Sequence, residues 1–447
     1  MKLRTLLLLA LAMLFFNPVV TLAADDASSD TFAGFDWSMT SDLRIESLYY
    51  PQSYGEGTNH NLNRLQLIPT FNGKSGEQWR AFIKPELFWD PQNNSASEKF
   101  FFEPREAFVK FKTPTFSVQA GNNIVNWGVT DGFNPLDSVN PRQYFDPLQS
   151  KKLGLTSLLF NLSTESTEHE WIVIPRGRAS QLPGTNSRWL PREIFVPRSK
   201  ENDVVLLLPP NIHFAYGETS ELNDPFGLQG GYRLQHHAGS IDLGLILYEG
   251  AAAFPVVQPV VTGTIVQVSP KNVIQVDPEV SLRQKFYRQR QAGLTWVSSQ
   301  MNFLLKLETS YSQSLGDDPL LPGWSHESVA ALERNFGFGN AQLTGVLQYS
   351  YIRDQKSDES NLSVSDIFRR AWMLGGRMTW DEVWTLNVLA LYDTLKYSHF
   401  EQLTLARRLQ DVWTLEASAM FISGDSATPL GVYNKNDNYR LALSRSF

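Results

Sequence analysis

The sequence contains no cysteine among its 447 residues. Disulfide bonds, thiolate metal sites and cysteine nucleophiles are therefore excluded. Hydrogen-bond ladders and side-chain packing must hold the fold together without covalent cross-links.

Long apolar runs are also scarce, and the one that stands out covers residues 5–16, directly after Lys2 and Arg4. A basic start, an apolar run and small residues before Ala24 are typical of a secretory signal peptide. The apolar run is too short for a membrane-spanning helix. We therefore expect residues 1–23 to be a signal peptide and residues 24–35 to form a short periplasmic segment.

Positive charge is in deficit, because the formal net charge is −7 at pH 7. An acidic chain of this kind argues against a nucleic-acid partner. Aromatic residues, in contrast, make up 12% of the chain, with 28 Phe and 12 Trp. Such a content suits the aromatic girdles that flank the lipid-facing band of a membrane barrel.

An alternation of apolar and polar residues runs through most of the chain. In residues 79–89 every odd position is apolar, while Arg80, Lys84 and Glu86 lie on the other side. A strand with one apolar and one polar face can meet lipid on one side and water on the other. The same period appears in residues 301–311, 341–351, 413–421 and 437–447.

Loop lengths between these segments alternate between short and long. Short turns are expected near residues 72–76, 112–115, 163–167, 236–240, 298–300, 337–340, 381–382 and 410–411. Longer loops are expected at residues 51–60, 91–99, 122–150, 176–225, 250–284, 314–324, 354–365 and 423–436, with a brief one near Ser398. A soluble sandwich has no reason to alternate its loops in this way.

We therefore predict an all-β fold: an antiparallel up-and-down transmembrane β-barrel in the bacterial outer membrane, formed by residues 36–447. It has about eighteen strands, short periplasmic turns and long extracellular loops. Sixteen or twenty strands stay open, because residues 204–210 and 212–216 fit either a strand pair or a loop. Side chains alone cannot fill a barrel of this width, so it encloses a channel or a plug. Residues 24–33 are too few for a plug domain, so any constriction must come from a loop that folds inward.

The best candidate for that constriction loop is residues 121–142, which are dense in Asn, Asp, Gly and Pro. These residues build ordered turns through side-chain hydrogen bonds to the backbone. One reading is a rigid loop packed on the barrel wall. In a second, Asp131, Asp137 or Arg142 reaches a permeating solute. In a third, Asp131, Asn134 and Asp137 bind calcium. We predict no metal and no cofactor.

Part of this segment, Trp127-Gly128-x-Thr130-Asp131-Gly132-x-Asn134-Pro135-x-Asp137, resembles a family of uncharacterised proteobacterial outer-membrane porin-like proteins. That family is more distantly similar to the barrels that export alginate and related polysaccharides. The resemblance implies an outer-membrane barrel and no particular substrate. The constriction-loop residues are then Trp127, Asp131, Asn134, Asp137 and Arg142.

The final strand is closed by Phe447. It resembles the ending of bacterial outer-membrane barrels, in which this residue is part of the assembly signal. The resemblance implies the barrel assembly machinery as a partner.

Charged residues on the polar strand faces are expected to line the pore. They are Arg44, Arg64, Arg80, Lys84, Glu86, Lys110, Lys306, Glu308 and Arg377. Basic residues on the early strands would form a positive stripe that attracts anions. The alternative is that these charges pair across strands and merely keep the wall wet.

We expect a porin-like channel for diffusion or facilitated transport of small solutes. A preference for anionic solutes stays open. The alternative is export or uptake of an acidic polysaccharide or a hydrophobic compound, which the apolar loop 250–284 would favour. An enzyme is not expected, since none of the seven His residues stands in a recognisable nucleophile arrangement. Expected partners are outer-membrane lipid and a small-molecule solute, and a homo-oligomer stays open.

Overall fold

The computed structural model describes residues 31–32, 34–54, 58–199, 201, 203–355 and 364–447. The predicted signal peptide and residues 24–30 of the predicted periplasmic segment lie outside these ranges. Within the ranges, no helix has the length and apolar character that crossing a membrane requires.

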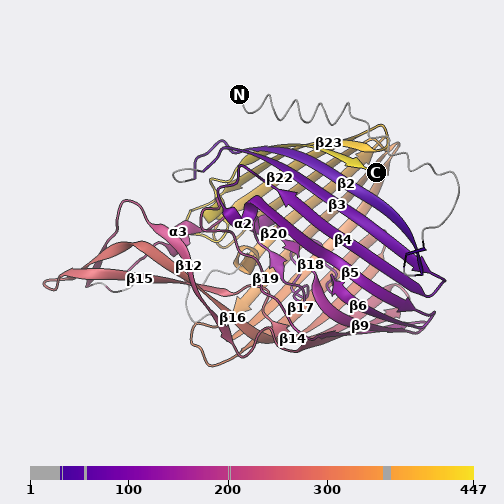
Figure 1. The fold of residues 1–447 in the computed structure, drawn as a ribbon, viewed down its shortest axis with the longest axis horizontal. Coiled ribbons are helices and arrows are strands. Elements are labelled where there is room, and N and C mark those ends of the chain that lie inside the picture. Colours follow the sequence, from indigo (N-terminus) through magenta and orange to yellow (C-terminus); the bar gives the residue numbers. More distant parts are fainter. Residues whose placement is uncertain (1–30, 33, 55–57, 200, 202, 356–363) are drawn as a thin grey trace.

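Eighteen antiparallel strands form a closed barrel (Figure 1), which confirms the predicted fold class and strand number. Each wall strand pairs with the wall strands before and after it, and β24 pairs with β2 to close the ring. The wall strands are β2 (Phe35–Tyr49), β3 (Asn61–Ser75), β4 (Trp79–Trp89), β5 (Phe100–Lys112), β6 (Phe116–Asn123), β9 (Leu155–Ser163), β10 (Thr167–Ile174), β13 (Gln229–Ala238), β14 (Ile241–Ala251), β16 (Asn272–Gln300), β17 (Phe303–Leu315), β18 (Trp324–Phe338), β19 (Ala341–Asp354), β20 (Arg370–Trp380), β21 (Trp384–Asp393), β22 (His399–Leu409), β23 (Trp413–Ser423) and β24 (Asn438–Ser446).

The alternating sequence separates the two faces of each strand. On β4, Trp79, Ile83 and Trp89 are 42–48% exposed on the outer wall, whereas Glu86 is only 2% exposed on the inner side. An outer wall of exposed aromatic and aliphatic side chains is what a lipid-facing surface requires.

Short hairpin turns connect the strands at one end of the barrel. In three of them the two central residues have positive φ angles: Met301–Asn302, Asp381–Glu382 and Gln410–Asp411. Two consecutive residues in this region make the type I′ turn, whose twist matches that of the flanking strands. This end corresponds to the predicted periplasmic side.

The long loops lie at the other end, where a smaller sheet projects beyond the barrel (Figure 1). It consists of β11 (Val204–Leu207), β12 (His213–Leu222), β15 (Val256–Gln267) and the first half of β16. We call it the extension sheet. β11 and β12 pair in parallel with β16 and not with each other. The two ambiguous segments are therefore strands, but they add none to the barrel wall.

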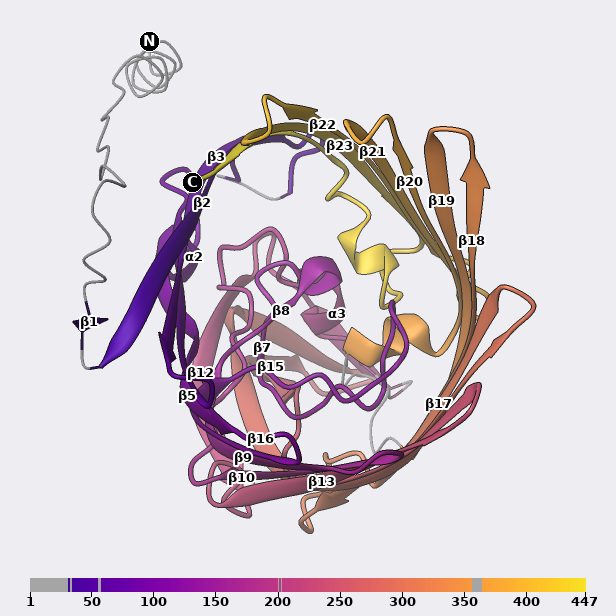
Figure 2. The same ribbon diagram turned by 90° about the vertical axis from the view of Figure 1, so that its right-hand side faces the viewer.

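The remaining short elements include several inside the ring, where Figure 2 shows β7, β8 and α3. Trp189, Phe400 and Leu430 belong to a buried cluster that packs loops onto the inner wall. The short elements are β1 (Thr31–Phe32), α2 (Ala96–Lys99), β7 (Arg142–Gln143), η1 (Pro147–Gln149), β8 (Lys151–Lys152), α3 (Arg192–Phe195), η2 (Val364–Phe368) and η3 (Gly431–Tyr433).

Candidate pore and constriction loop

The loop between β6 and β9, residues 124–154, folds into the barrel and carries β7, η1 and β8 (Figure 2). We call it the constriction loop. Its position follows from contacts with side chains on the inner faces of distant wall strands.

Glu308 of β17 is the main attachment point of the constriction loop. Its Oε2 accepts hydrogen bonds from the N–H groups of Val129 (2.9 Å) and Thr130 (3.3 Å) and from the Thr130 hydroxyl (3.2 Å), and its Oε1 accepts from the N–H of Leu136 (2.8 Å). The residue is 2% exposed. A carboxylate with four donors satisfies backbone groups that an irregular loop leaves without partners. Glu308 thus lies beneath the loop and positions it.

Neighbouring strands hold the tip of the constriction loop. Lys306 on β17 donates to Asp131 at 2.7 Å and pairs with Glu333 on β18 at 3.0 Å. Gln348 on β19 accepts a hydrogen bond from the N–H of Gly132 at 3.3 Å. β17 and β19 therefore bind one short stretch of the loop directly, and β18 holds Lys306 through Glu333.

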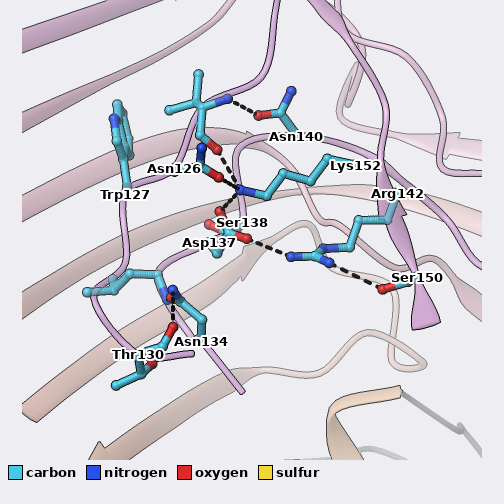
Figure 3. A network of polar contacts seen from close by, with 12 residues as sticks. Asn126, Trp127, Thr130, Asn134, Asp137, Ser138, Asn140, Arg142, Ser150 and Lys152 are labelled. Atoms are coloured by element: carbon cyan, nitrogen blue, oxygen red, sulfur yellow. Dashed lines mark hydrogen bonds and ion pairs between the residues drawn. The ribbon is translucent and has the colours of Figure 1, made fainter. Parts of the chain in front are cut away.

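Polar side chains also brace the constriction loop internally (Figure 3). Asp137 accepts from Arg142 at 2.6 Å and from Lys152. Asn140 accepts a hydrogen bond from the N–H of Val125 at 2.7 Å. It also donates to the carbonyl of Leu153 at 2.9 Å. These bonds explain why the segment is rich in Asn and Asp, whose short side chains reach nearby backbone.

The same bonds leave the calcium reading without support. Asp131 and Asp137 are bound to cationic side chains, and the side chain of Asn134 bonds to the backbone of Thr130 and Leu136. Among the described residues, no group of His, Asp and Glu is arranged to hold a metal ion.

Trp127 fixes the start of the constriction loop to the wall. It is 2% exposed, and its indole N–H donates to Glu170 on β10. Its ring lies against Gly231 on β13, where an added Cβ would come within 2.5 Å of the ring. The absence of a side chain at Gly231 therefore makes room for the indole, and Trp127 is buried in this contact.

A cavity of about 1000 Å³ lies beside the constriction loop. One part of its lining is apolar and includes Phe133, Phe368, Met373, Leu391, Phe400 and Leu430. Another part is basic, with Arg105, Arg142, Lys151 and Lys152.

Each carboxylate among these basic residues is shared by two cations. Glu86 contacts Arg105 at 3.3 Å and Lys151 at 2.8 Å, and Asp137 lies between Arg142 and Lys152. Both clusters therefore keep one positive charge in excess. Glu86 itself is almost fully buried.

Comparison with solved structures places this barrel among known folds. OccAB1 of Acinetobacter baumannii aligns with a TM-score of 0.51 at 9% identity, covering 94% of this chain and 99% of the other. The chain has the fold of outer-membrane porins. OccK9 (OpdG) of Pseudomonas aeruginosa aligns at 0.49 with 11% identity, over 92% and 98% of the two chains. No family model and no curated protein matches the sequence.

In this porin fold, two of the predicted pore residues belong to an ion-pair network around the barrel closure. Arg44 contacts Glu46 at 3.2 Å and Glu416 at 2.8 Å, and Arg64 contacts Asp90 at 2.9 Å and Glu46 at 3.4 Å. The wall here therefore carries both signs of charge. This arrangement agrees with the alternative in which lumen charges pair across strands.

Arg80 and Lys110, two other predicted basic residues, lie nearer the short turns and are not neutralised in this way. Register places Lys74, Arg80 and Lys110 side by side on β3, β4 and β5. Arg80 donates to the backbone carbonyls of Gly76 and Trp79. Like charges on adjacent strands destabilise a sheet unless water or an anion screens them.

Two further predicted pore residues also lack carboxylate partners. Lys84 and Arg377 form no ion pair or hydrogen bond through their side chains with any described residue. The register places Lys84 opposite Glu106, and Lys110 likewise has no bonded partner within the described ranges.

Sequence reasoning missed Arg188, which holds a second loop in the barrel mouth. Its guanidinium lies 3.7 Å from the centre of the Tyr50 ring and donates to Asn436 Oδ1 (3.1 Å) and to the carbonyls of Gln52 (3.0 Å), Asn59 (3.3 Å) and Lys435 (3.1 Å). It is 7% exposed. The nearby apolar Trp189 and Leu190 in a polar loop were the one available signal.

Histidine contacts do not build a nucleophile arrangement in the described part of the chain. The Ser53 hydroxyl lies 3.1 Å from His60 Nε2, but His60 Nδ1 bonds to a backbone carbonyl and not to a carboxylate. His237 bonds to Asp242 in a turn region without a Ser at its other nitrogen. A relay of three groups needs both contacts on one His.

Asp146 gives the constriction loop a pH dependence. Burial raises its pKa to about 6, although Arg64 and Arg440 oppose the shift, and its Oδ1 accepts from the N–H of Leu148. Because the pKa of Asp146 in the folded protein lies above its ordinary value, Asp146 increases the free energy of unfolding at low pH. This contribution is complete below the ordinary pKa and is lost as pH rises through about 6.

We expect Asp146→Asn, which keeps the Oδ1 acceptor, to reduce this loss. Between pH 5 and 7 the wild type should lose about 1 kcal/mol of folding free energy that the variant retains. The midpoint of thermal unfolding, followed by heat-modifiable gel mobility at both pH values, measures the difference. Parallel curves for the two proteins would contradict the assignment.

Proposed function

We propose that the chain is an outer-membrane channel through which small solutes diffuse or are transported, with a preference for anions. The observation that carries this is the constriction loop, which Glu308, Lys306 and Gln348 hold inside a closed eighteen-stranded barrel. A barrel of this width encloses space that side chains do not fill, and an inward loop sets the width of the passage.

Charge supports the preference for anions. The two clusters around Glu86 and Asp137 each carry an excess cation beside the cavity. Lys84, Lys110 and Arg377 add side chains without carboxylate partners in the described residues. In a pore, excess basic groups raise the local concentration of anions and lower their entry barrier.

A second candidate is export or uptake of a larger molecule, either an acidic polysaccharide or a hydrophobic compound. The apolar side of the cavity, with Phe133, Phe368 and Phe400, favours the hydrophobic compound. The polysaccharide is supported by the resemblance of the constriction-loop motif to a porin-like family that is distantly similar to polysaccharide exporters. Both candidates are transport functions without enzymatic chemistry.

The test is single-channel recording of the refolded mature protein in a planar bilayer under a salt gradient. Stable open steps with a reversal potential on the anion side support the small-solute channel. A folded barrel that stays closed to salt would contradict it and favour the larger substrate. Heat-modifiable gel mobility before recording ensures that the protein is folded.

Lys84→Glu is expected to move the reversal potential toward cation selectivity. The change replaces an unpaired positive charge by a negative one opposite Glu106, and so inverts the sign of this part of the wall. Lys271→Glu, the same change at an exposed position in the turn between β15 and β16, is the matched control and should leave the potential unchanged. Equal shifts in both variants would remove Lys84 from the pathway.

A further inference from the structure

Three arginines on the outer wall lie over aromatic rings. Arg334 is 4.5 Å from the ring centre of Phe303, Arg407 is 5.0 Å from that of Trp384, and Arg445 is 5.2 Å from that of Trp413. Arg445 also lies 4.4 Å from the ring centre of Phe447, the last residue of the chain.

The alternation of the strands shows that these arginines face outward. On β22, Arg407 follows Leu403 and Leu405, which are exposed on the outer wall. On β24, Arg445 shares a face with Tyr439 and Leu441, both about half exposed. Arg440, on the other face of β24, pairs with Glu416 inside the barrel.

Arg334 on β18 repeats the pattern. It directly follows Glu333, whose side chain turns inward to Lys306, so that Arg334 points the other way. All three arginines lie close to the short turns, and therefore at the periplasmic end of the apolar band. Aromatic girdles mark the level of the lipid headgroups, which at this end belong to the inner leaflet.

None of the three guanidinium groups has a hydrogen-bond or ion-pair partner among the described residues. The Nε atoms of Arg334 and Arg445 are buried and lack any partner. A guanidinium presents five donors in a planar fork that matches phosphate geometry. Aromatic rings orient such a group and leave its donors available to water or to an anion from outside the protein.

We propose that Arg407 and Arg445 form a binding site for the phosphate of an anionic glycerophospholipid in the inner leaflet. They lie on β22 and β24, with β23 between them and an offset of two residues along the strands, so their Cα atoms are about 12 Å apart. On β23, Leu415 pairs in register with Arg407 and Trp413 with Arg445. Trp384 lies under Arg407 and Trp413 under Arg445, and the lipid headgroup bridges the two cations.

The acyl chains have a matching surface above the headgroup. Leu415, Leu403 and Leu441 are 39%, 49% and 55% exposed on β23, β22 and β24. A lipid whose phosphate lies between Arg407 and Arg445 can therefore lay its chains along this apolar strip. The charge of the site and its apolar extension together favour a phospholipid over a soluble anion.

The test is native mass spectrometry of the refolded mature protein titrated with phosphatidylglycerol, and with phosphatidylcholine for comparison. The wild type should retain phosphatidylglycerol preferentially. The double variant Arg407→Gln/Arg445→Gln should bind it roughly tenfold more weakly or worse, because two cations near the membrane surface are lost. Unchanged binding in this variant would overturn the proposal.

Arg408→Gln is the matched control, because the next residue along β22 faces into the barrel and should not affect lipid binding. An equal loss in this control would mean that total charge and not the site attracts lipid, and would overturn the proposal.

Arg407→Lys/Arg445→Lys keeps the charge and removes the fork, so it tests the site if the Gln variant fails to fold. Intermediate binding is expected from it, and wild-type binding would contradict phosphate recognition by the forks. A variant that loses a second protein copy and no lipid would show an oligomer contact in place of the site.

Discussion

Replacing Glu308 by alanine is expected to raise the single-channel conductance roughly twofold or more, because the constriction loop leaves its position across the lumen. The carboxylate accepts from three backbone N–H groups and one hydroxyl of the loop. A buried donor without an acceptor costs about 1–3 kcal/mol. Keeping the loop in place with these donors unsatisfied therefore costs more than releasing it to water. Recording in planar bilayers measures the change.

Two controls separate loop release from a change of charge in the pore. Glu308→Gln removes the same charge but keeps one acceptor oxygen, so it should give a smaller rise in conductance than Glu308→Ala. Glu333→Gln removes a nearby inner-wall charge that binds Lys306 and no described loop residue. If Glu333→Gln raises conductance as much as Glu308→Ala, the anchor role is wrong.

Arg188→Ala is expected to detach the loop that carries α3 from the barrel mouth. The side chain donates four hydrogen bonds to the loops around residues 52–59 and 435–436, and it is stacked on Tyr50. Hydrogen bonds from a charged group contribute about 1.5–3 kcal/mol each. Hydrogen bonds to water cannot replace the joint loss of four such bonds, so the loop should leave the barrel mouth. Limited proteolysis should cut residues 176–198 much faster in the variant than in the wild type, while the barrel stays intact.

Lysine at position 188 is a demanding control for this prediction. It keeps the positive charge but cannot form the fork that reaches Asn436 and three carbonyls together. Arg188→Lys should therefore be cut nearly as fast as Arg188→Ala. Arg192→Ala, in the same loop but bonded only within it and stacked less closely on Tyr54, should be cut more slowly. Wild-type cleavage rates in Arg188→Ala would contradict the role of Arg188 in holding this loop.

The wall strands could be predicted because each one carries its own pattern. Residues 79–89 alternate without a break, and β4 begins at Trp79 and ends at Trp89 as expected. Short turns between consecutive strands allow few alternative pairing registers. They also place consecutive strands side by side, so the order of strands in the wall follows their order in the chain. Residues 250–284 were expected to be a loop. Their strands became visible only when β15 and β16 paired, because Val-rich segments carry no period that distinguishes a strand from a buried loop.

The partners of the inner-wall charges could not be predicted, since they depend on contacts between distant parts of the chain. Arg44 meets Glu416, 372 residues away, across the barrel closure. Glu308 lies under the constriction loop, and the sequence does not say that a loop covers that face. Trp127 was singled out by its motif, whereas its place against Gly231 depends on a glycine about a hundred residues later.

The constriction loop also sets an order of events during folding. The loop follows β6, yet its partners Gln291, Glu308 and Gln348 come 153 to 216 residues later in the chain. The wall itself grows by pairing of consecutive strands, and only the β2–β24 closure joins its two ends. The tip of the early loop must therefore wait until β16 to β19 have been added. Docking of the tip is a late, non-local step, and chains stalled before β17 would hold the start of the loop through Trp127 but lack Glu308 and Lys306, which fix its tip.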